Sequence, residues 1–248
     1  MKVLLVLITL TLISFTLTGQ GNCNSCTVYK GYIASDIEMW KKGMEEASVT
    51  WLKDPSSCTL YTLTEARYGY IGYLLGNGNK EEARPIIDDF EKDVCQLAAF
   101  ADRKVEAEAF MIALLGFRME LNPARAMSLG PKALKQLEKA METGGDNPAV
   151  WIERANSEAS MPAFVGGSKV KAVESLRYAI SLFELKRESL GCNWRYLNTY
   201  LLLGKVLEQT GDYKGACETY RKVLQEEPAF LEVRNKLLPA AEKKIKEV

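Results

Sequence analysis

Cysteines are the residues whose type and spacing come closest to chemistry in this chain of 248 residues. Two of the six, Cys23 and Cys26, form a Cys-x-x-Cys pair in a polar N-terminal arm, residues 20–34. A redox-active pair of this spacing sits at a helix start that follows a strand, and a metal site needs further ligands. The arm offers neither context. A local disulfide, or a disulfide from the arm to the body, is the expectation that remains.

Histidine is absent from the sequence, which removes the commonest acid, base and metal ligand of proteins. No Ser-His-Asp or Cys-His pair can form, and no zinc site that uses histidine. The carboxylates of Asp88, Asp89 and Glu91 lie beside Lys92, which is typical of a solvated helix face. A glycosidase pair would have to face across a cleft. We therefore expect no catalytic residues, no cofactor and no metal ion.

The overall composition is that of an ordinary globular protein. The chain has 32 Lys and Arg against 32 Asp and Glu, and 47% of its residues are hydrophobic. A disordered chain would be poorer in apolar residues. A nucleic-acid binder that works through bulk charge would need a basic excess, so we expect no nucleic-acid partner.

The first residues have the pattern of a targeting segment. Lys2 precedes an apolar run over residues 3–13, and small or polar residues follow up to Gln20. This order is typical of a secretory signal peptide, predicted over residues 1–19, and the run is short for a membrane span. A retained membrane anchor is the alternative. With the signal removed, we expect a periplasmic or secreted protein without a membrane span.

The body of the chain shows a repeated helical pattern. Four amphipathic helices each carry a small alanine, a core residue four positions later and another three positions further, so that all three share one helix face. These triplets are Ala83-Ile87-Phe90, Ala133-Leu137-Ala140, Ala172-Leu176-Ala179 and Ala216-Tyr220-Val223.

Each of these helices is preceded by a turn and by another helix. The preceding helices are predicted over residues 59–76, 102–121, 148–160 and 194–210. The turns are Gly76-Asn77-Gly78-Asn79, Gly130-Pro131, Gly166-Gly167 and Gly211-Asp212. Alternation of β-branched residues is nearly absent, so the pattern predicts four helical hairpins and no sheet.

The two ends of this region are expected to cap the hairpins. Amphipathic helices are predicted over residues 37–51 and 229–245. Stacked hairpins need such end helices, because each hairpin otherwise exposes an apolar side. Lysines near residue 245 are typical of a solvated helix end. A contact with an acidic partner or with anionic lipid is the sharper alternative.

Residues 197–230 resemble a tetratricopeptide repeat. Residues 200–207 are similar to the first-helix segment of that family, and Gly211, Ala216, Tyr220 and Pro228 follow at its spacings. The other hairpins match more weakly, and the turn over residues 159–167 is similar to that of exported tetratricopeptide proteins of Gram-negative, Bacteroidota-like envelopes. The resemblance implies an all-α, right-handed superhelix of about four hairpins with capping helices, over residues 35–248.

The resemblance also implies a binding surface. The first helix of each hairpin lines the concave face of such a stack, which usually binds partners. The residues carried over to that face are Glu65, Tyr68, Phe110, Phe117, Asn156, Asn198, Leu201 and Lys205. Core packing is the alternative for the two phenylalanines. In the inserted loop, Phe164 either pins the loop to the body or contacts a ligand.

Hairpin geometry places Cys58 and Cys95 at the same end of the first pair. We expect them near each other, with a possible disulfide between them. Cys217, inside a helix beside Ala216, is typical of a small buried thiol.

These expectations lead to one main hypothesis and one alternative. The main hypothesis is an exported, noncatalytic scaffold or adaptor that binds a protein or peptide partner through its concave face. The alternative is a periplasmic helical-repeat component that binds a small ligand beside a solute transporter. Ligand-induced thermal stabilisation separates the two.

Overall fold

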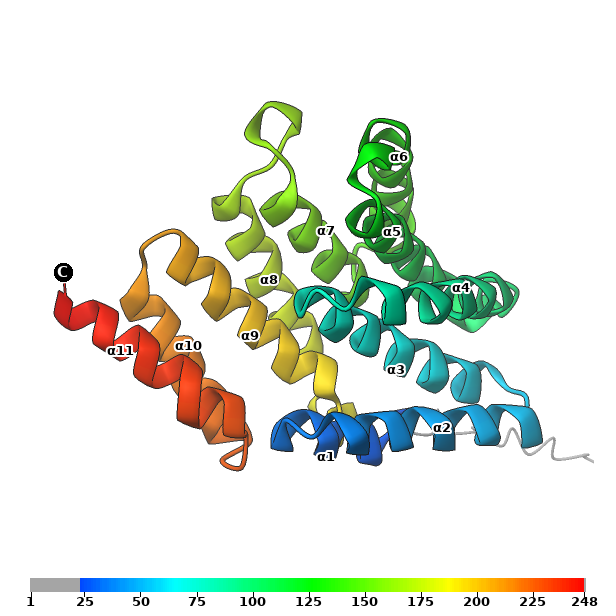
Figure 1. Ribbon diagram of the computed structural model, residues 1–248, viewed down its shortest axis with the longest axis horizontal. Coiled ribbons are helices and arrows are strands. Elements are labelled where there is room, and N and C mark those ends of the chain that lie inside the picture. Colours follow the sequence, from blue (N-terminus) through cyan, green and yellow to red (C-terminus); the bar gives the residue numbers. More distant parts are fainter. Residues whose placement is uncertain (1–22, 248) are drawn as a thin grey trace, which may run out of the picture.

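The computed structural model describes residues 23–247, and every regular element in that range is a helix (Figure 1). The all-α prediction is confirmed. The predicted signal peptide and its cleavage point lie outside the described residues. Within residues 23–247, no helix combines the length and the apolar character that a membrane crossing requires.

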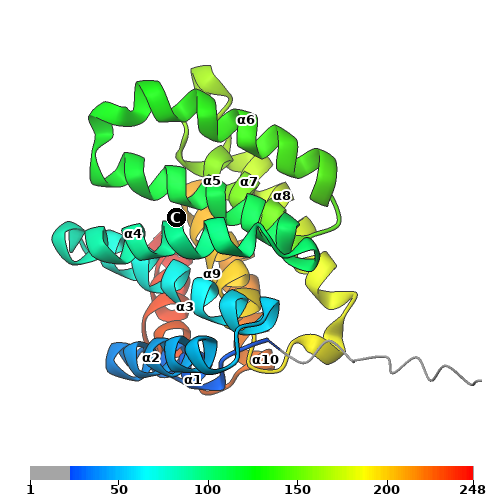
Figure 2. The same cartoon turned by 90° about the vertical axis from the view of Figure 1, so that its right-hand side faces the viewer.

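Four consecutive helical hairpins form the body. They are α3 (Ser57–Gly76) with α4 (Lys80–Leu97), α5 (Lys104–Leu121) with α6 (Ala126–Gly144), α7 (Pro148–Ser160) with α8 (Lys169–Glu184), and α9 (Trp194–Gln209) with α10 (Tyr213–Glu226). Each helix packs on the next along the chain. Figure 2 shows the stack rising from α1 and α2 through α3 and α4 to α6.

Capping residues explain where most of these helices begin. The hydroxyl of Ser56 caps α3 in a reciprocal capping box with Thr59. Side chains of Asn147, Ser168, Asn193 and Asp212 cap α7, α8, α9 and α10. Each accepts a hydrogen bond from an amide of the first turn that would otherwise have no partner. The predicted bounds of the first helix of each hairpin therefore agree with the structure to within a few residues.

The turn predicted at Gly130-Pro131 is wrong. Both residues lie inside α6, which begins at Ala126. The chain turns earlier, at Asn122, whose side chain accepts a hydrogen bond of 3.2 Å from the Ala124 amide. Asn-Pro at residues 122–123 is a stronger turn former than Gly-Pro at residues 130–131, because the Asn side chain supplies its own hydrogen-bond acceptor.

The alanine triplets face the core, with one weaker case. Ala83, Ala172 and Ala216 are fully buried, whereas Ala133 is only half-buried. The buried residues of α6 are Leu129, Ala140 and Gly144. The second hairpin thus packs less deeply than the other three.

The N-terminal segment is helical, which corrects the expectation of a polar arm. Helix α1 (Cys26–Ala34) begins at the second cysteine, with Ser25 as its cap, and α2 (Ile37–Lys53) follows. Helix α2 packs on α3 as a capping helix should, and α1 also reaches α9. Because α9 opens the last hairpin, α1 joins the two ends of the helical series (Figure 1).

Two disulfides fasten this connection. Cys23 pairs with Cys58 in the first turn of α3, and Cys26 pairs with Cys192 just before α9. The proposed Cys58–Cys95 disulfide is wrong, because Cys95 is a free, exposed thiol on α4. Being at one end of a hairpin does not fix the direction of a side chain, and Cys58 turns toward the N-terminal segment. Cys217 is a buried free thiol, as predicted.

The C-terminal segment caps the last hairpin. A π-helical turn, Val233–Leu237, runs directly into α11 (Leu238–Glu247), and both pack on α10. Phe230, Val233 and Ala241 are fully buried in the core that α9 and α10 share.

Candidate functional site

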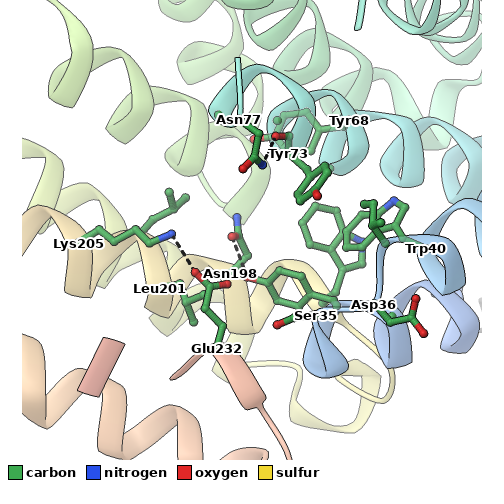
Figure 3. Close-up of a pocket in the computed structure, with 18 of the residues that line it drawn as sticks. Ser35, Asp36, Trp40, Tyr68, Tyr73, Asn77, Asn198, Leu201, Lys205 and Glu232 are labelled. Atoms are coloured by element: carbon green, nitrogen blue, oxygen red, sulfur yellow. Dashed lines mark hydrogen bonds and ion pairs between the residues drawn. The ribbon is translucent and has the colours of Figure 1, made fainter. Parts of the chain in front are cut away.

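A groove of about 740 Å³ opens on the inner side of the stack. The turn between α1 and α2 forms one wall, the second half of α3 forms the floor, and α9 with residues 232–236 forms the other wall (Figure 3). The volume lies within the range typical of small-molecule sites. Residues from both ends of the chain therefore meet in one concave site.

Glycines leave the α3 floor bare. Gly69, Gly72 and Gly76 lie at helical spacing and all line the groove. A side chain at Gly69 would overlap the rings of Trp40 and Trp194, whereas Gly72 and Gly76 face open space. Helix α3 thus presents its backbone directly to anything in the groove.

Aromatic rings line one end of the groove. The rings of Trp40 and Trp194 lie 4.9 Å apart, edge to face, and Tyr32 contacts both. The indole nitrogen of Trp40 donates a hydrogen bond of 3.0 Å to the Ala66 carbonyl. Further aromatic lining comes from Tyr68, Tyr73 and Phe117. Packing buries the rings of Trp40, Trp194 and Tyr68 and fixes their positions, and Tyr73 is the exposed ring among them.

The opposite end is polar. The Tyr32 hydroxyl donates to Oδ1 of Asn198 at 2.9 Å, which leaves the Asn198 amide nitrogen able to donate. Lys205 lies 3.7 Å from Glu232, whereas Asp36 lines the groove on the opposite side, beside Trp40. Charges of both signs and an amide donor are thus available to a ligand (Figure 3).

A buried ionic network lies under the groove. Arg195, which is 3% exposed, places its guanidinium 3.8 Å from the Glu65 carboxylate and 5.2 Å from the ring centres of Tyr68 and Phe110. Tyr61 donates to the same carboxylate at 2.7 Å. The network joins α3, α5 and α9 beneath the rings that line the groove.

A second buried carboxylate extends the network to α7. The Tyr68 hydroxyl donates to Glu153 at 2.7 Å, and the Asn156 amide donates to the same carboxylate at 3.3 Å. Burial raises the pKa of Glu153 and the pKa of Glu65. Burial also raises the pKa of Tyr68 well above its ordinary value, so this phenol stays a donor. The network holds side chains in place and offers no exposed acid and base pair.

The sequence-predicted site residues divide into three groups. Those that line the groove are Tyr68, Phe117, Asn156, Asn198, Leu201 and Lys205. Glu65 and Phe110 are buried in the layer beneath it. Phe164 is 89% exposed on the loop between α7 and α8, so it neither pins that loop nor reaches the groove.

Sequence reasoning missed the residues that close the groove. Tyr32, Asp36 and Trp40 come from the N-terminal helices, and Glu232 and Lys236 come from the C-terminal segment. The spacing of three glycines within one helix was the available signal, because helix glycines cost stability and mark a close approach or an opening. Within residues 23–247, no group of three or more His, Cys, Asp or Glu side chains is arranged to hold a metal ion.

No protein-family model matches the chain. The BBSome complex member bbs-4 of Caenorhabditis elegans is 32% identical over 106 residues. This match takes in 42% of the present chain and 21% of that protein, so the similarity spans about a fifth of the relative.

Two solved structures share the fold. The HusA haemophore from Porphyromonas gingivalis aligns with a TM-score of 0.59 and 20% identity, over 77% of this chain and 96% of the haemophore. A thermophilic TPR protein from Thermus thermophilus aligns with a TM-score of 0.55 and 15% identity, over 89% of this chain and 97% of that protein. The chain therefore has the helical scaffold of tetratricopeptide (TPR) proteins, as predicted.

Proposed function

We propose that this protein is an exported, noncatalytic binding protein whose groove takes a compact, planar, largely apolar ligand with an ionised edge. A porphyrin is the ligand class that we select for testing. The proposal favours the small-ligand alternative over an open peptide channel, although the groove keeps six of the residues expected on the concave face.

Closure of the groove by α1 carries this proposal. In an open stack of hairpins the concave face continues from end to end, so an extended chain can run along it. Here α1 is bonded to the start of α9 through Cys26–Cys192, and its Tyr29 hydroxyl donates to Glu227 at 2.8 Å. A site of about 740 Å³ walled on both sides suits a compact ligand better than a long peptide.

The lining matches a planar ligand. A ring system can lie over the bare backbone at Gly72 and Gly76, with the exposed ring of Tyr73 beside it. Ionised groups at its rim would meet Lys205 or Lys236 and the Asn198 amide. The likeness of the fold to that of a haemophore supports the choice of a porphyrin as the first probe.

Export is supported by the cysteines. Two disulfides that join distant parts of the chain form and persist in an oxidising compartment. Together with the predicted signal peptide, they favour a periplasmic or secreted protein. The absence of catalysis is supported by the buried, mutually bonded state of Glu65, Glu153 and Tyr68.

A short segment of a partner protein is the second candidate occupant. The polar end of the groove favours it, because Asn198, Lys205 and Glu232 can bond main-chain groups or a terminal carboxylate. A TPR protein has the same scaffold, and this likeness supports the second candidate.

A titration with metal-free protoporphyrin IX tests the proposal. The wild-type protein should bind it in the micromolar range or tighter, as measured by tryptophan quenching and by calorimetry. Gly72→Phe should weaken binding by about tenfold or more, which is about 1.4 kcal/mol. The new ring would fill the groove, and no atom lies within 4 Å of the added Cβ to oppose it.

Gly130→Phe is the matched control. Gly130 is also a helical glycine with no atom within 4 Å of an added Cβ, but it lies on α6, away from the groove. The control should bind as the wild type does. Failure of the wild type to bind protoporphyrin, or equal binding by both variants, would remove the planar-ligand proposal. Saturable binding of a peptide that Gly72→Phe abolishes would establish the second candidate instead.

A further inference from the structure

The loop between α7 and α8 is held in a tight, fixed conformation. The Val165 and Gly167 amides donate to the Pro162 carbonyl at 3.0 and 3.1 Å, and the Ser168 amide donates to the Glu158 carbonyl at 2.7 Å. A side chain at Gly167 would overlap the main chain of Met161, so the loop can close this tightly only with glycine there. The loop therefore presents its outer side chains in defined positions.

The tip of this loop is apolar and exposed. Phe164 is 89% exposed, Val165 is 44% exposed, and Val170 in the first turn of α8 is 65% exposed. An exposed phenylalanine at the tip of a fixed loop lowers solubility. Within residues 23–247, nothing covers this side chain.

Two lysines frame the apolar tip. Lys169 and Lys171 are exposed in the first turn of α8, which contains no acidic residue. The start of a helix carries the positive end of the helix dipole, so cations are unfavourable there and carboxylates are preferred. The two lysines thus occupy positions that helix stability alone would disfavour.

We propose that this loop docks the protein on an anionic lipid surface. Phe164 and Val170 would enter the boundary between headgroups and acyl chains, and Lys169 and Lys171 would lie against the headgroup phosphates. An apolar tip framed by cations is complementary to a negatively charged membrane surface. The proposal is independent of the ligand that the groove takes.

The size of the feature favours a lipid surface over a protein partner. Residues 161–171 project as one loop and one helical turn (Figure 1). A stable protein interface draws on about 20 to 30 residues from each side. A bilayer accepts a smaller wedge, because the acyl region surrounds the inserted side chains without any matching pocket.

The position of the loop is compatible with an open groove. In Figure 1 the loop projects on the side of α7 and α8 that lies away from α1 and α2. The groove is walled by the α1–α2 turn and α9, so docking through the loop would leave it accessible.

Vesicle flotation with the full-length mature protein tests the proposal. Vesicles of phosphatidylcholine are compared with vesicles that contain phosphatidylglycerol as well. Binding should require the anionic lipid and should weaken as salt is added. Phe164→Ala should reduce partitioning about tenfold, and Lys169→Glu with Lys171→Glu should reduce it about fivefold or more per lysine.

Matched controls separate the loop from other exposed features. Leu52→Ala removes another exposed apolar side chain, at the end of α2, and should leave binding unchanged. Lys243→Glu with Lys246→Glu removes cations from the end of α11 and should also leave most binding intact. If this second pair abolishes binding while the loop variants do not, the C-terminal lysines are the lipid contact and the proposal is overturned.

Insertion of the tip has its own readout. In Phe164→Trp, brominated acyl chains should quench the added tryptophan when anionic vesicles are present, beyond the quenching of the wild-type tryptophans. Absence of this extra quenching, or absence of binding to anionic vesicles, would also overturn the proposal. If the loop variants lose binding to a purified protein partner but keep their binding to anionic vesicles, the loop serves that partner instead.

Discussion

The hairpins α9–α10 and α5–α6 follow the same plan but pack very differently. Eleven of the residues of α9 are buried, and Gly204 lies so close to Tyr220 that any side chain there would overlap the ring. Helix α6 buries three residues, and its local core is a small cluster around Ile112 and Val150. Helix α9 forms a wall of the groove, whereas α6 lies on the side of the molecule away from α1 and α2 (Figure 2).

Of the two hairpins, the one that forms a wall of the groove is held more firmly. Helix α9 is held by a disulfide at its start, by Arg195 in the buried network and by close packing on α10. Those anchors fix the side chains that face the groove, namely Asn198, Leu201 and Lys205. Helix α6 contributes nothing to the groove lining, and within the described residues no disulfide joins it to another helix.

Removing the anchor at the start of α9 should have the largest effect. Cys26→Ser with Cys192→Ser opens a loop of 166 residues, which a chain-entropy estimate equates with about 5 kcal/mol of unfolding free energy. Cys23→Ser with Cys58→Ser opens a loop of 35 residues and should cost about 4 kcal/mol. Denaturant unfolding of the three proteins measures both. A cost below about 1 kcal/mol for the first pair would mean that α1 does not fasten α9.

Removing the buried cation should come next. Arg195→Met leaves Glu65 and Glu153 buried without compensation and should cost about 3 to 5 kcal/mol. Arg125→Met, at an exposed arginine just before α6, should stay within about 0.5 kcal/mol. Equal costs would show that Arg195 is not the charge that stabilises α9.

The cost of Arg195→Met should also depend on pH. Burial raises the pKa of both carboxyls in the folded protein, and Arg195 opposes that rise. Without the arginine, the folded state holds these protons more tightly than the unfolded chain does. The variant should therefore regain stability as the pH falls from about 7 toward 4.5, the ordinary value for a glutamate, and lose it as the pH rises.

The smallest changes in stability are expected from two glycine-to-alanine substitutions, and these changes should have opposite signs. Gly204→Ala forces the added methyl group into Tyr220 and should cost about 1 to 3 kcal/mol. Gly130→Ala meets no neighbouring atom within 4 Å and should stabilise α6 by up to about 1 kcal/mol through helix propensity. Thermal unfolding measures both, and a stabilising Gly204→Ala would contradict the close packing of α9 on α10.

Local sequence pattern predicted most of the fold because hairpins are local structures. Helical periodicity and turn residues placed seven of the eight hairpin helices, apart from small shifts at their ends. The start of α6 was the exception, since two competing turn formers, Asn122-Pro123 and Gly130-Pro131, lie close together. Helical periodicity does not show which of these two sites forms the turn.

The groove was harder to predict because it depends on contacts between distant residues. Tyr32 from α1 meets Asn198 of α9, and these residues are 166 positions apart. The four cysteines that enforce this closure allow several pairings, and sequence alone does not choose among them. The concave residues of α9 were found because their hairpin carries the strongest repeat pattern.

Amide hydrogen exchange with and without saturating protoporphyrin IX tests the central claim most directly. If the groove is the binding site, ligand should slow exchange in residues 69–77 of α3 and in residues 198–205 of α9. Exchange in α6 should be unchanged. Protection confined to α5 and α6, or no protection in either wall of the groove when the ligand is bound, would contradict the account.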